Sequence, residues 1–243
     1  MKLKEYLKET EIFLKDYLES NHLDSYVLGL SGGVDSSLVA AIARNAVGKD
    51  RLFCYALDVE SNPVDIEDAK KVAKELDLNL EVINLTDTYK AYLKALKGDE
   101  FIRLTKSNLK VRMRMVALFA YAQEHRGLVL GTDNADERYV GYFTKYGDGA
   151  VDILPIVHLT KAEVREGAKL YGLSDVLADR VATAGLFEGQ TDEKEMGVSY
   201  ADLDAYLLGT EISKEAKERI EYLHKISEHK RNPIPEMKPF KRD

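Results

Sequence analysis

The sequence predicts a single α/β domain over residues 1–243, built on a doubly wound parallel sheet with helices on both faces. Short apolar runs alternate with amphipathic stretches from residue 25 to residue 132, as in chains of βαβ units. A turn rich in Gly and Ser directly follows the first apolar run, at the edge where such sheets bind ligands. Of the 243 residues, 45% are hydrophobic, which is enough for a sizeable core.

The expected elements follow in a regular order. Apolar runs bounded by turn residues predict strands at residues 25–30, 52–58, 80–85 and 127–132. Apolar side chains at helical spacing predict helices at residues 2–20, 38–47, 65–76, 86–97, 107–125 and 213–229, and an acidic helix start follows the fourth strand. The crossovers between parallel strands should be right-handed.

Two later segments lack this periodicity. Residues 143–155 form a turn region punctuated by Gly and Asp. Residues 180–197 carry small and polar side chains, so we expect a mobile loop there that closes over bound substrates. Its acidic residues, Asp192, Glu193 and Glu195, are expected to be solvated and not to bind a metal.

Composition excludes several classes of protein. A net charge of −7 argues against nucleic acid and anionic membranes as partners, because both attract basic surfaces. Cys54 is the only cysteine and lies in an apolar run, so we expect a buried thiol rather than a disulfide, a zinc site or a nucleophile. No apolar run is long enough to span a membrane and the N-terminus does not resemble a signal peptide, which favours the cytoplasm.

The segment SGGVDSS, residues 31–37, carries the strongest chemical signal. Two glycines permit a tight turn and a close approach of the backbone to a ligand, and the following helix offers free N–H groups and a positive dipole end. The pattern predicts a phosphate cradle that differs from a Walker A loop, because no Lys follows the glycines. Asp35 would repel phosphate by itself, so it is expected to hold Mg²⁺. A serine-capped structural turn is the alternative.

SGGVDSS resembles the pyrophosphate-binding loop of the ATP pyrophosphatase group, which adenylates a substrate oxygen and releases pyrophosphate. The block GTDNADERYVGYFTKYGDGAVDILPIVHLTKAEV at 131–164 resembles the long signature of NAD synthetases, and SNPVDIEDAKKVA, SNLKVRMRM and TAGLFEGQTDEKEMG resemble further blocks in the same order. The resemblance implies an adenine nucleotide alpha hydrolase-like fold. It also implies a ligase that amidates deamido-NAD through an acyl-adenylate, in the final step of NAD biosynthesis. Members that use glutamine carry an extra amidase domain with a catalytic Cys, so this chain is expected to use free ammonia.

The resemblance also implies roles for individual residues. Mg²⁺ would be held by Asp35 and Glu137, and Lys161 would stabilise charge at the α-phosphate without a side-chain nucleophile. The residues expected to bind ATP are Ser31, Gly32, Gly33, Val34, Asp35, Ser36, Ser37, Thr132, Lys161 and Thr183. Those expected to bind deamido-NAD are Asn108, Arg112, Lys145, Asp148, Asp152, His229 and Lys230. The family further implies a homodimer in which both subunits contribute to each substrate site.

Plainer interpretations stay open for several of these residues. Glu137 and Lys161 could be ordinary solvated helix residues, and the pair Asn108 and Arg112 could be part of a basic helix face. Arg138 departs from the family pattern, and its charge could alter metal or substrate contacts. The alternative functions are another adenylating enzyme, such as a tRNA-thiolating one, and a non-catalytic nucleotide-binding module. The single cysteine and the acidic balance disfavour the thiolating enzyme, and the long signature block disfavours the binding module.

Overall fold

The computed structural model describes residues 1–182 and 191–242. Its centre is a parallel sheet of four strands in the order β3-β2-β1-β4, formed by β1 (Ser25–Gly29), β2 (Leu52–Asp58), β3 (Leu80–Asn84) and β4 (Gly127–Leu130). A parallel bridge from Leu130 to Ile153 extends the sheet beyond β4. The chain moves outward from β1 to β3 and then returns to the other side of β1, so the strand order reverses between β1 and β4. This is the switch point at which doubly wound folds bind ligands.

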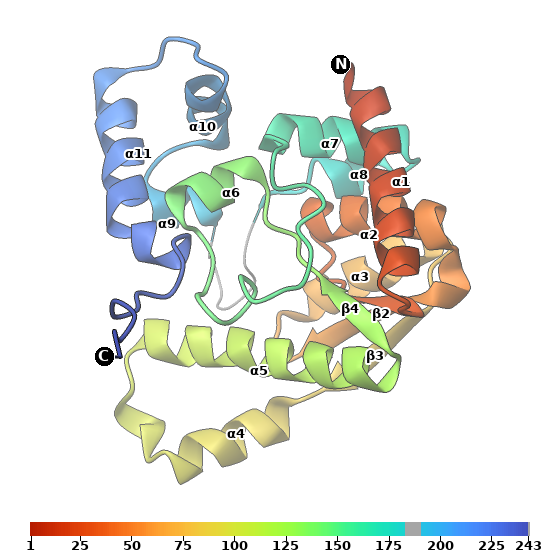
Figure 1. Cartoon of the computed structure of the whole chain (residues 1–243), viewed down its shortest axis with the longest axis horizontal. Coiled ribbons are helices and arrows are strands. Elements are labelled where there is room, and N and C mark those ends of the chain that lie inside the picture. The colour runs from red at the N-terminus through yellow and green to blue at the C-terminus, as the bar shows by residue number, and fades with distance from the viewer. Residues whose placement is uncertain (183–190, 243) are drawn as a thin grey trace.

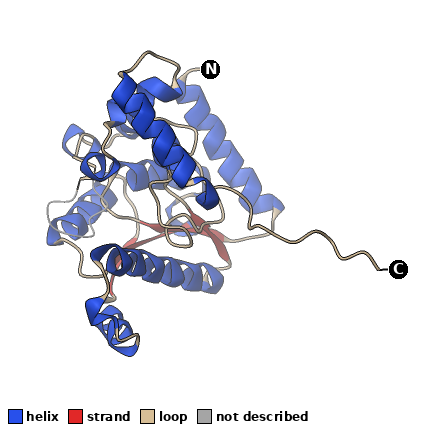
Figure 2. Ribbon diagram, turned by 90° about the vertical axis from the view of Figure 1, so that its left-hand side faces the viewer, coloured by secondary structure: helices blue, strands red, loops and turns tan. Residues whose placement is uncertain are grey.

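Helices cover both faces of the sheet, as the sequence predicts (Figures 1 and 2). The helices α2 (Val34–Val47) and α3 (Pro63–Glu75) pack on one face, and α5 (Arg103–Glu124) packs on the other. Two further helices, α1 (Leu3–Ser20) and α7 (Lys161–Leu170), pack against α2. Helix α4 (Thr86–Ala95) lies beside α5, on the side of α5 that is away from α2 (Figure 1). The remaining helices are α6 (Ala135–Val140), α8 (Asp175–Ala178), α9 (Asp192–Met196), α10 (Tyr200–Leu207) and α11 (Lys214–Ile226).

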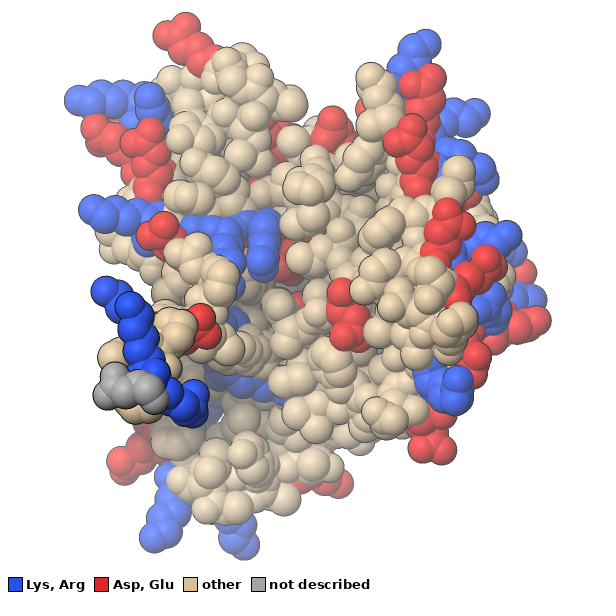
Figure 3. All heavy atoms as spheres, viewed as in Figure 1, with Lys and Arg blue, Asp and Glu red and all other residues tan. Residues whose placement is uncertain are grey.

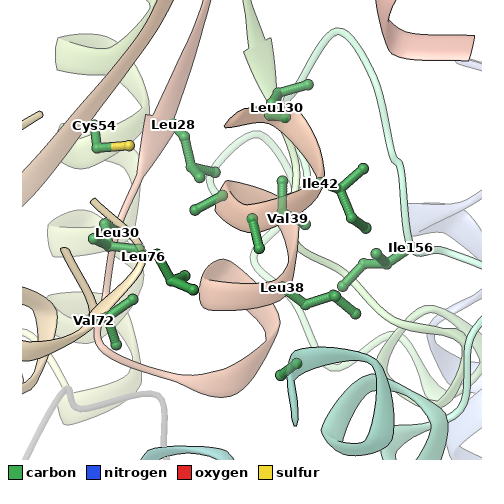
Figure 4. Close-up of a cluster of buried hydrophobic side chains, with 14 of the residues drawn as sticks. Leu28, Leu30, Leu38, Val39, Ile42, Cys54, Val72, Leu76, Leu130 and Ile156 are labelled. Carbon is green, nitrogen blue, oxygen red and sulfur yellow. The ribbon is translucent and has the colours of Figure 1, made fainter. Parts of the chain in front are cut away.

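The main core lies between the sheet and the layer of α1, α2 and α7 (Figure 4). Leu28 of β1, Val39 of α2 and Ile156 are completely buried in it. Helix α2 is buried on nearly all sides because its alanines let both the sheet and the outer helices approach closely. Cys54 is 1% exposed in β2, and burial raises the pKa of its thiol to about 12, which confirms the expected structural thiol.

A second, smaller core joins the C-terminal helices to α6. Val140, Met196, Tyr200, Leu203 and Ile220 form its buried part. The end of α6 therefore packs against α9, α10 and α11, and only its start faces the sheet. This arrangement brings C-terminal residues next to the loop that follows β4.

The predicted strands and helices are present and differ from the observed ones mainly at their ends, whereas α7, α8, α9 and α10 are not predicted. Helix α2 begins at Val34 rather than at residue 38, because Gly33 is its N-cap and the Asp and Ser residues of the motif form its first turn. The predicted loop at 180–197 lies only partly within the described residues, and its last part forms α9. No helix in the described ranges is both long and apolar enough to cross a membrane.

Candidate active site

A cavity of about 860 Å³ opens at the carboxyl ends of β1 and β4. Its walls come from the turn after β1, the start of α6, the middle of α5, and the turn region after α6 together with the short helix η3 (Glu228–Lys230). In Figure 3 lysine and arginine side chains lie beside the hollow of the face shown, and acidic side chains lie both near it and over the outer parts of this face. The cavity thus occupies the switch point of the sheet, and its lining carries both basic and acidic side chains.

The turn between β1 and α2 has the geometry of an anion cradle. Gly32 has a φ of +80°, and a Cβ at this position would lie 2.8 Å from the backbone nitrogen of Ala69. Gly33 caps α2, so the unpaired N–H groups of the first helical turn lie at the cavity. The Ser36 hydroxyl donates to the Gly33 carbonyl at 3.0 Å and lies 3.1 Å from the Ser31 hydroxyl. These contacts hold the turn open at the helix N-terminus.

Lys161 lies at the centre of an ion-pair cluster that joins two motifs distant in sequence. Its side chain is 2% exposed, and its Nζ lies 2.5 Å from Asp35 Oδ2 and 3.3 Å from Glu137 Oε1. Asn134 donates to the other oxygen of Asp35 at 2.8 Å. Burial alone lowers the pKa of Lys161, but the charges of Asp35 and Glu137 outweigh burial and raise this pKa above its ordinary value. The two carboxylates therefore converge on one cationic position.

Side chains from the C-terminal helices contact this cluster. The Tyr200 hydroxyl lies 3.1 Å from Glu137 Oε1 and 3.0 Å from Asp192 Oδ2, and Lys161 Nζ lies 4.7 Å from the centre of the Tyr200 ring. Burial raises the pKa of Glu137 to about 7, although Lys161 acts in the opposite direction. Asp192 is 5% exposed and accepts from the Tyr142 hydroxyl at 3.2 Å. The expectation that Asp192 is a solvated loop residue is wrong, because α9 turns it inward onto two tyrosines.

The start of α7, which carries Lys161, is held by two further carboxylates. Asp136 Oδ2 accepts from the Lys161 backbone N–H at 2.7 Å. Asp204 of α10 accepts from the backbone N–H groups of Lys161 and Ala162, at 3.1 Å each. Burial, together with the charge of Asp204, raises the pKa of Asp136 to about 8. Acidic groups at a helix N-terminus complement its dipole, so α6 and α10 together fix the position of Lys161.

Three elements meet at the other end of the cavity. Asn108 and Arg112 lie one turn apart on α5; Asn108 Oδ1 accepts from the Thr144 hydroxyl at 2.8 Å. Arg112 donates to the Lys145 carbonyl at 3.2 Å, and Lys145 Nζ donates to the His229 carbonyl at 2.6 Å. Polar and basic groups from α5, the turn region and η3 therefore surround the same end of the cavity.

Two charged residues at this end are held by backbone groups. Asp148 accepts from the Thr144 backbone N–H at 2.7 Å, and burial raises the pKa of its carboxyl. Lys230 Nζ donates to the carbonyls of Gly141 and Phe143, at 2.6 Å each, and burial lowers the pKa of Lys230. The two hydrogen bonds of Lys230 tie η3 to the chain between α6 and the turn region.

This constellation of a glycine–serine cradle, a Lys161 cluster and a basic far end agrees with the comparisons to known proteins. The sequence profile of NAD synthase matches residues 6–234. The chain belongs to the NAD synthase family. An NH3-dependent NAD+ synthetase of Mesoplasma florum is 41% identical over 244 residues, which cover 100% of this chain and 100% of that protein.

Two solved structures relate the fold to this family as well. The NMN synthetase from Francisella tularensis superposes with a TM-score of 0.92 and 37% identity, over 98% of this chain and 99% of that chain. The NH3-dependent NAD synthetase from Campylobacter jejuni superposes with a TM-score of 0.80 and 26% identity, over 98% of this chain and 100% of that chain. The resemblance to NAD synthetases and the single α/β domain with its parallel sheet are therefore confirmed.

Most residues expected to bind substrates line the cavity of this NAD synthase fold: Ser31, Gly33, Val34, Asp35, Ser36, Asn108, Arg112, Thr132, Glu137, Lys145, Asp148, Lys161, His229 and Lys230. Three do not line it. Ser37 donates to the Gly33 carbonyl at 2.8 Å, Asp152 accepts from the Val129 backbone N–H at 2.7 Å, and Gly32 shapes the cradle from behind. Thr183 lies outside the described residues.

Several residues of this NAD synthase site are not indicated by sequence patterns. Tyr200 and Asp204 lie on α10, a short helix that the periodicity does not predict. Asp136 and Asp133 belong to the acidic stretch after β4, in which the sequence analysis selects Glu137 alone. The high number of acidic residues in that stretch is the one sequence signal that could have indicated Asp133 and Asp136. It is a weak signal, because a solvated acid and a buried acid cannot be distinguished in sequence.

Proposed function

We propose that this chain amidates the nicotinate carboxylate of deamido-NAD with ammonia at the expense of ATP. NH3-dependent NAD+ synthetase activity, a ligase reaction that completes NAD biosynthesis, is the activity of the family to which the chain belongs. The observation that carries the proposal is the Asp35–Lys161–Glu137 cluster beside the cradle after β1. A buried cation and two carboxylates beside this cradle support binding of ATP phosphates there.

The reaction needs an activated carboxylate, because oxide is not a usable leaving group. A carboxylate oxygen attacks the α-phosphorus of ATP, pyrophosphate leaves, and an acyl-adenylate results. Ammonia then attacks the acyl carbon and AMP departs. Within the chain, the N–H groups at the start of α2 bind phosphate oxygens, and Lys161 stabilises the negative charge that develops during adenylation. Both steps depend on positioning and charge more than on a side-chain nucleophile.

The same cluster fits a divalent cation. Asp35 and Glu137 converge on one position, and Mg²⁺ is commonly bound by one or two carboxylates together with phosphate oxygens and water. Among residues 1–182 and 191–242, no group of three or more His, Cys, Asp or Glu side chains could hold a metal by itself. We therefore propose that Asp35 and Glu137 hold Mg²⁺ together with ATP, where the ion would neutralise charge on the leaving pyrophosphate.

The remaining assignments combine position in or next to the cavity with family resemblance. The cradle residues 31–37 with Thr132, Lys161 and Thr183 are proposed to bind ATP, and Thr183 enters on family resemblance alone. The far end is proposed to bind the dinucleotide, with Lys145 near the nicotinate carboxylate and with Asn108, Arg112, Asp148, Asp152, His229 and Lys230 around it. The hydrogen bond from Lys145 to His229 supports one shared subsite, because it joins the turn region to η3.

Nicotinate mononucleotide is a second candidate substrate. The observation that favours it is the TM-score of 0.92 with an NMN synthetase, which covers 98% of this chain, against 0.80 for an NAD synthetase. Both substrates present the same nicotinate carboxylate and ribose phosphate, so the chemistry described above is unchanged. They differ in the adenylate half, which only the dinucleotide carries.

The deciding assay offers both carboxylate substrates to the purified protein. Each is incubated with ATP, Mg²⁺ and ammonium, and NAD, NMN, AMP and pyrophosphate are quantified, with glutamine replacing ammonium in parallel. NAD formed from ammonium but not from glutamine supports the first proposal, and a kcat/KM that favours NMN formation supports the second. If neither substrate triggers release of AMP and pyrophosphate, both proposals are wrong.

We also propose that the chain acts as a homodimer in the cytoplasm. Family resemblance suggests the dimer, and α5 carries large apolar side chains that are well exposed, including Leu104 at 64% and Val116 at 62%. Exposed apolar groups on a helix beside the substrate site are suited to contact a second subunit. The cytoplasmic assignment rests on the use of ATP and on the absence of apolar spans in the sequence.

A further inference from the structure

The space between Asp35 and Glu137 cannot hold the Lys161 ammonium and a metal ion together. Lys161 Nζ lies 2.5 Å from Asp35 Oδ2 and 3.3 Å from Glu137 Oε1. Bonds from Mg²⁺ to carboxylate oxygens are about 2.1 Å long, so an ion shared by these two oxygens occupies the space that the ammonium fills. The two cations would also repel one another strongly at such a separation. Metal binding between the two carboxylates therefore requires the ammonium to leave.

The side chain of Lys161 can leave without a movement of α7. The backbone N–H of Lys161 donates to Asp136 at 2.7 Å and to Asp204 at 3.1 Å. These acceptors lie on α6 and α10, so two other helices hold the start of α7 in place. The ammonium stands at the end of a flexible stem of four carbons. Rotation of this stem is enough to separate the ammonium from the two carboxylates.

A displaced ammonium needs a new anion, because Lys161 is almost completely buried and water cannot replace the lost contacts. Asp192 also attracts Lys161. Its two oxygens, however, already accept from the hydroxyls of Tyr200 and Tyr142. The phosphate cradle adjoins the first turn of α2, which carries Asp35, and it faces the cavity that Lys161 lines. Phosphate groups in the cradle are therefore suited to receive the ammonium.

The inference rests on the proposed function, which brings ATP and Mg²⁺ into this cavity. We propose that Lys161 occupies the metal position in the absence of nucleotide and yields it to Mg²⁺ when ATP phosphates receive its ammonium. Without ATP, metal binding leaves a buried ammonium unpaired, so Lys161 opposes it. With ATP, the metal and the ammonium each gain an anion. Binding of metal and of ATP then favour one another, because coupling between two ligands is reciprocal.

The test measures metal affinity without nucleotide, with Mn²⁺ as the probe and electron paramagnetic resonance to quantify the free ion. The wild-type protein should bind Mn²⁺ weakly at this position. Lys161→Met removes the competing ammonium and keeps an unbranched side chain, so it should tighten Mn²⁺ binding by roughly 10- to 100-fold. Addition of Asp35→Asn to this variant should abolish the tight binding, because the ion then loses one of its two carboxylates.

Arg138→Met distinguishes displacement from a general change in charge. Arg138 follows Glu137 in the sequence and lies 4.0 Å from Asp133, so this variant also removes one positive charge near Glu137. The Arg138 guanidinium lies over the Phe143 ring and not between Asp35 and Glu137. Because no cation leaves the metal position in this variant, its Mn²⁺ affinity should stay within a few-fold of wild type.

Thermal unfolding provides a second readout that does not depend on catalysis. A ligand that binds the folded state raises its stability according to its affinity. Saturating Mg²⁺ without nucleotide should therefore raise the Tm of Lys161→Met by several degrees and leave the wild-type Tm almost unchanged. If Lys161→Met does not fold without metal, refolding on addition of Mg²⁺, followed by circular dichroism, takes the place of this measurement.

Three results would overturn the inference: equal Mn²⁺ affinity in wild type and Lys161→Met, equal gains in Lys161→Met and Arg138→Met, or a tight site that survives Asp35→Asn. Formation of NAD or NMN by the wild type beside any of these would leave the proposed function standing. Selective tightening in Lys161→Met supports the exchange of cations. If neither carboxylate substrate then triggers release of AMP and pyrophosphate, the proposed function is wrong although the exchange occurs.

Discussion

At the scale of single residues, the main feature is one position for a cation between Asp35 and Glu137. In this structure the Lys161 ammonium fills that position. A lysine with a 2% exposed side chain has lost nearly all of its hydration, and the two carboxylates together with the Tyr200 ring replace it. The cluster therefore contributes to stability as well as to the proposed site.

Replacement of Lys161 by Met should lower both stability and activity. Asp35 and Glu137 would lose their shared cationic partner, which we expect to reduce the free energy of unfolding by about 3–5 kcal/mol. Urea unfolding at neutral pH measures this loss. Lys169→Met on the same helix is the matched control, because Lys169 pairs with Asp179 at the exposed surface, and it should change stability little. A Lys161→Met protein as stable as the control would contradict this account.

At the scale of elements, the turn before α2 depends on one glycine in a left-handed conformation. Gly32 combines a φ of +80° with a close approach to α3, where an added Cβ would lie 2.8 Å from the Asp65 carbonyl oxygen. Backbone atoms at that distance cannot move aside as a flexible side chain can. Helix α3 therefore supports the cradle on the side away from the cavity, and α2 provides the N–H groups on the cavity side.

Gly32→Ala should cost about 1–3 kcal/mol of stability and weaken ATP binding strongly. Gly48→Ala separates the two causes, because Gly48 has a φ of +81° and nothing within 4 Å of an added Cβ. That variant carries the backbone strain alone, so it should lose less stability and keep its ATP affinity. Thermal unfolding and calorimetric titration with ATP provide the two measurements. Equal effects of both variants would show that the contact with α3 is unimportant.

A second prediction at this scale concerns the link from α10 to α7. Asp204→Ala removes the acceptor of the Ala162 N–H and one acceptor of the Lys161 N–H, so the start of α7 loses its tie to α10. We expect kcat for adenylation to fall roughly 10- to 100-fold with little change in KM for ATP, because Lys161 is displaced while the cradle is not. Asp202→Ala on the same helix is the control. A rise in KM alone would contradict the role assigned to Asp204.

At the scale of the whole molecule, the elements around the cavity come from three apolar clusters. The main core positions the cradle, another cluster packs α5 on the opposite face of the sheet, and the C-terminal core positions Tyr200 of α10 against Asp192 of α9. Residues from the beginning, middle and end of the chain therefore meet at one site (Figure 1). Beyond η3 the chain runs out in an extended conformation away from the body (Figure 2).

The proposed homodimer can be tested through the exposed face of α5. Val116→Glu places a charge on that face and should convert a dimer into a monomer, measured by light scattering after size-exclusion chromatography. Val176→Glu is the control, because Val176 is 84% exposed on α8 and lies outside the proposed contact. A dimer that survives Val116→Glu would exclude α5 as the centre of the interface.

The sequence by itself determines the parallel sheet, its helices and the cradle, because these depend on local periodicity and on a glycine motif. It also indicates Asp35, Glu137 and Lys161 through family resemblance. Only the tertiary structure decides that these three share one cation position, since they lie on three different helices. It likewise decides that Asp192 and Asp133 are buried, because the exposure of an acid depends on which distant segments pack around it.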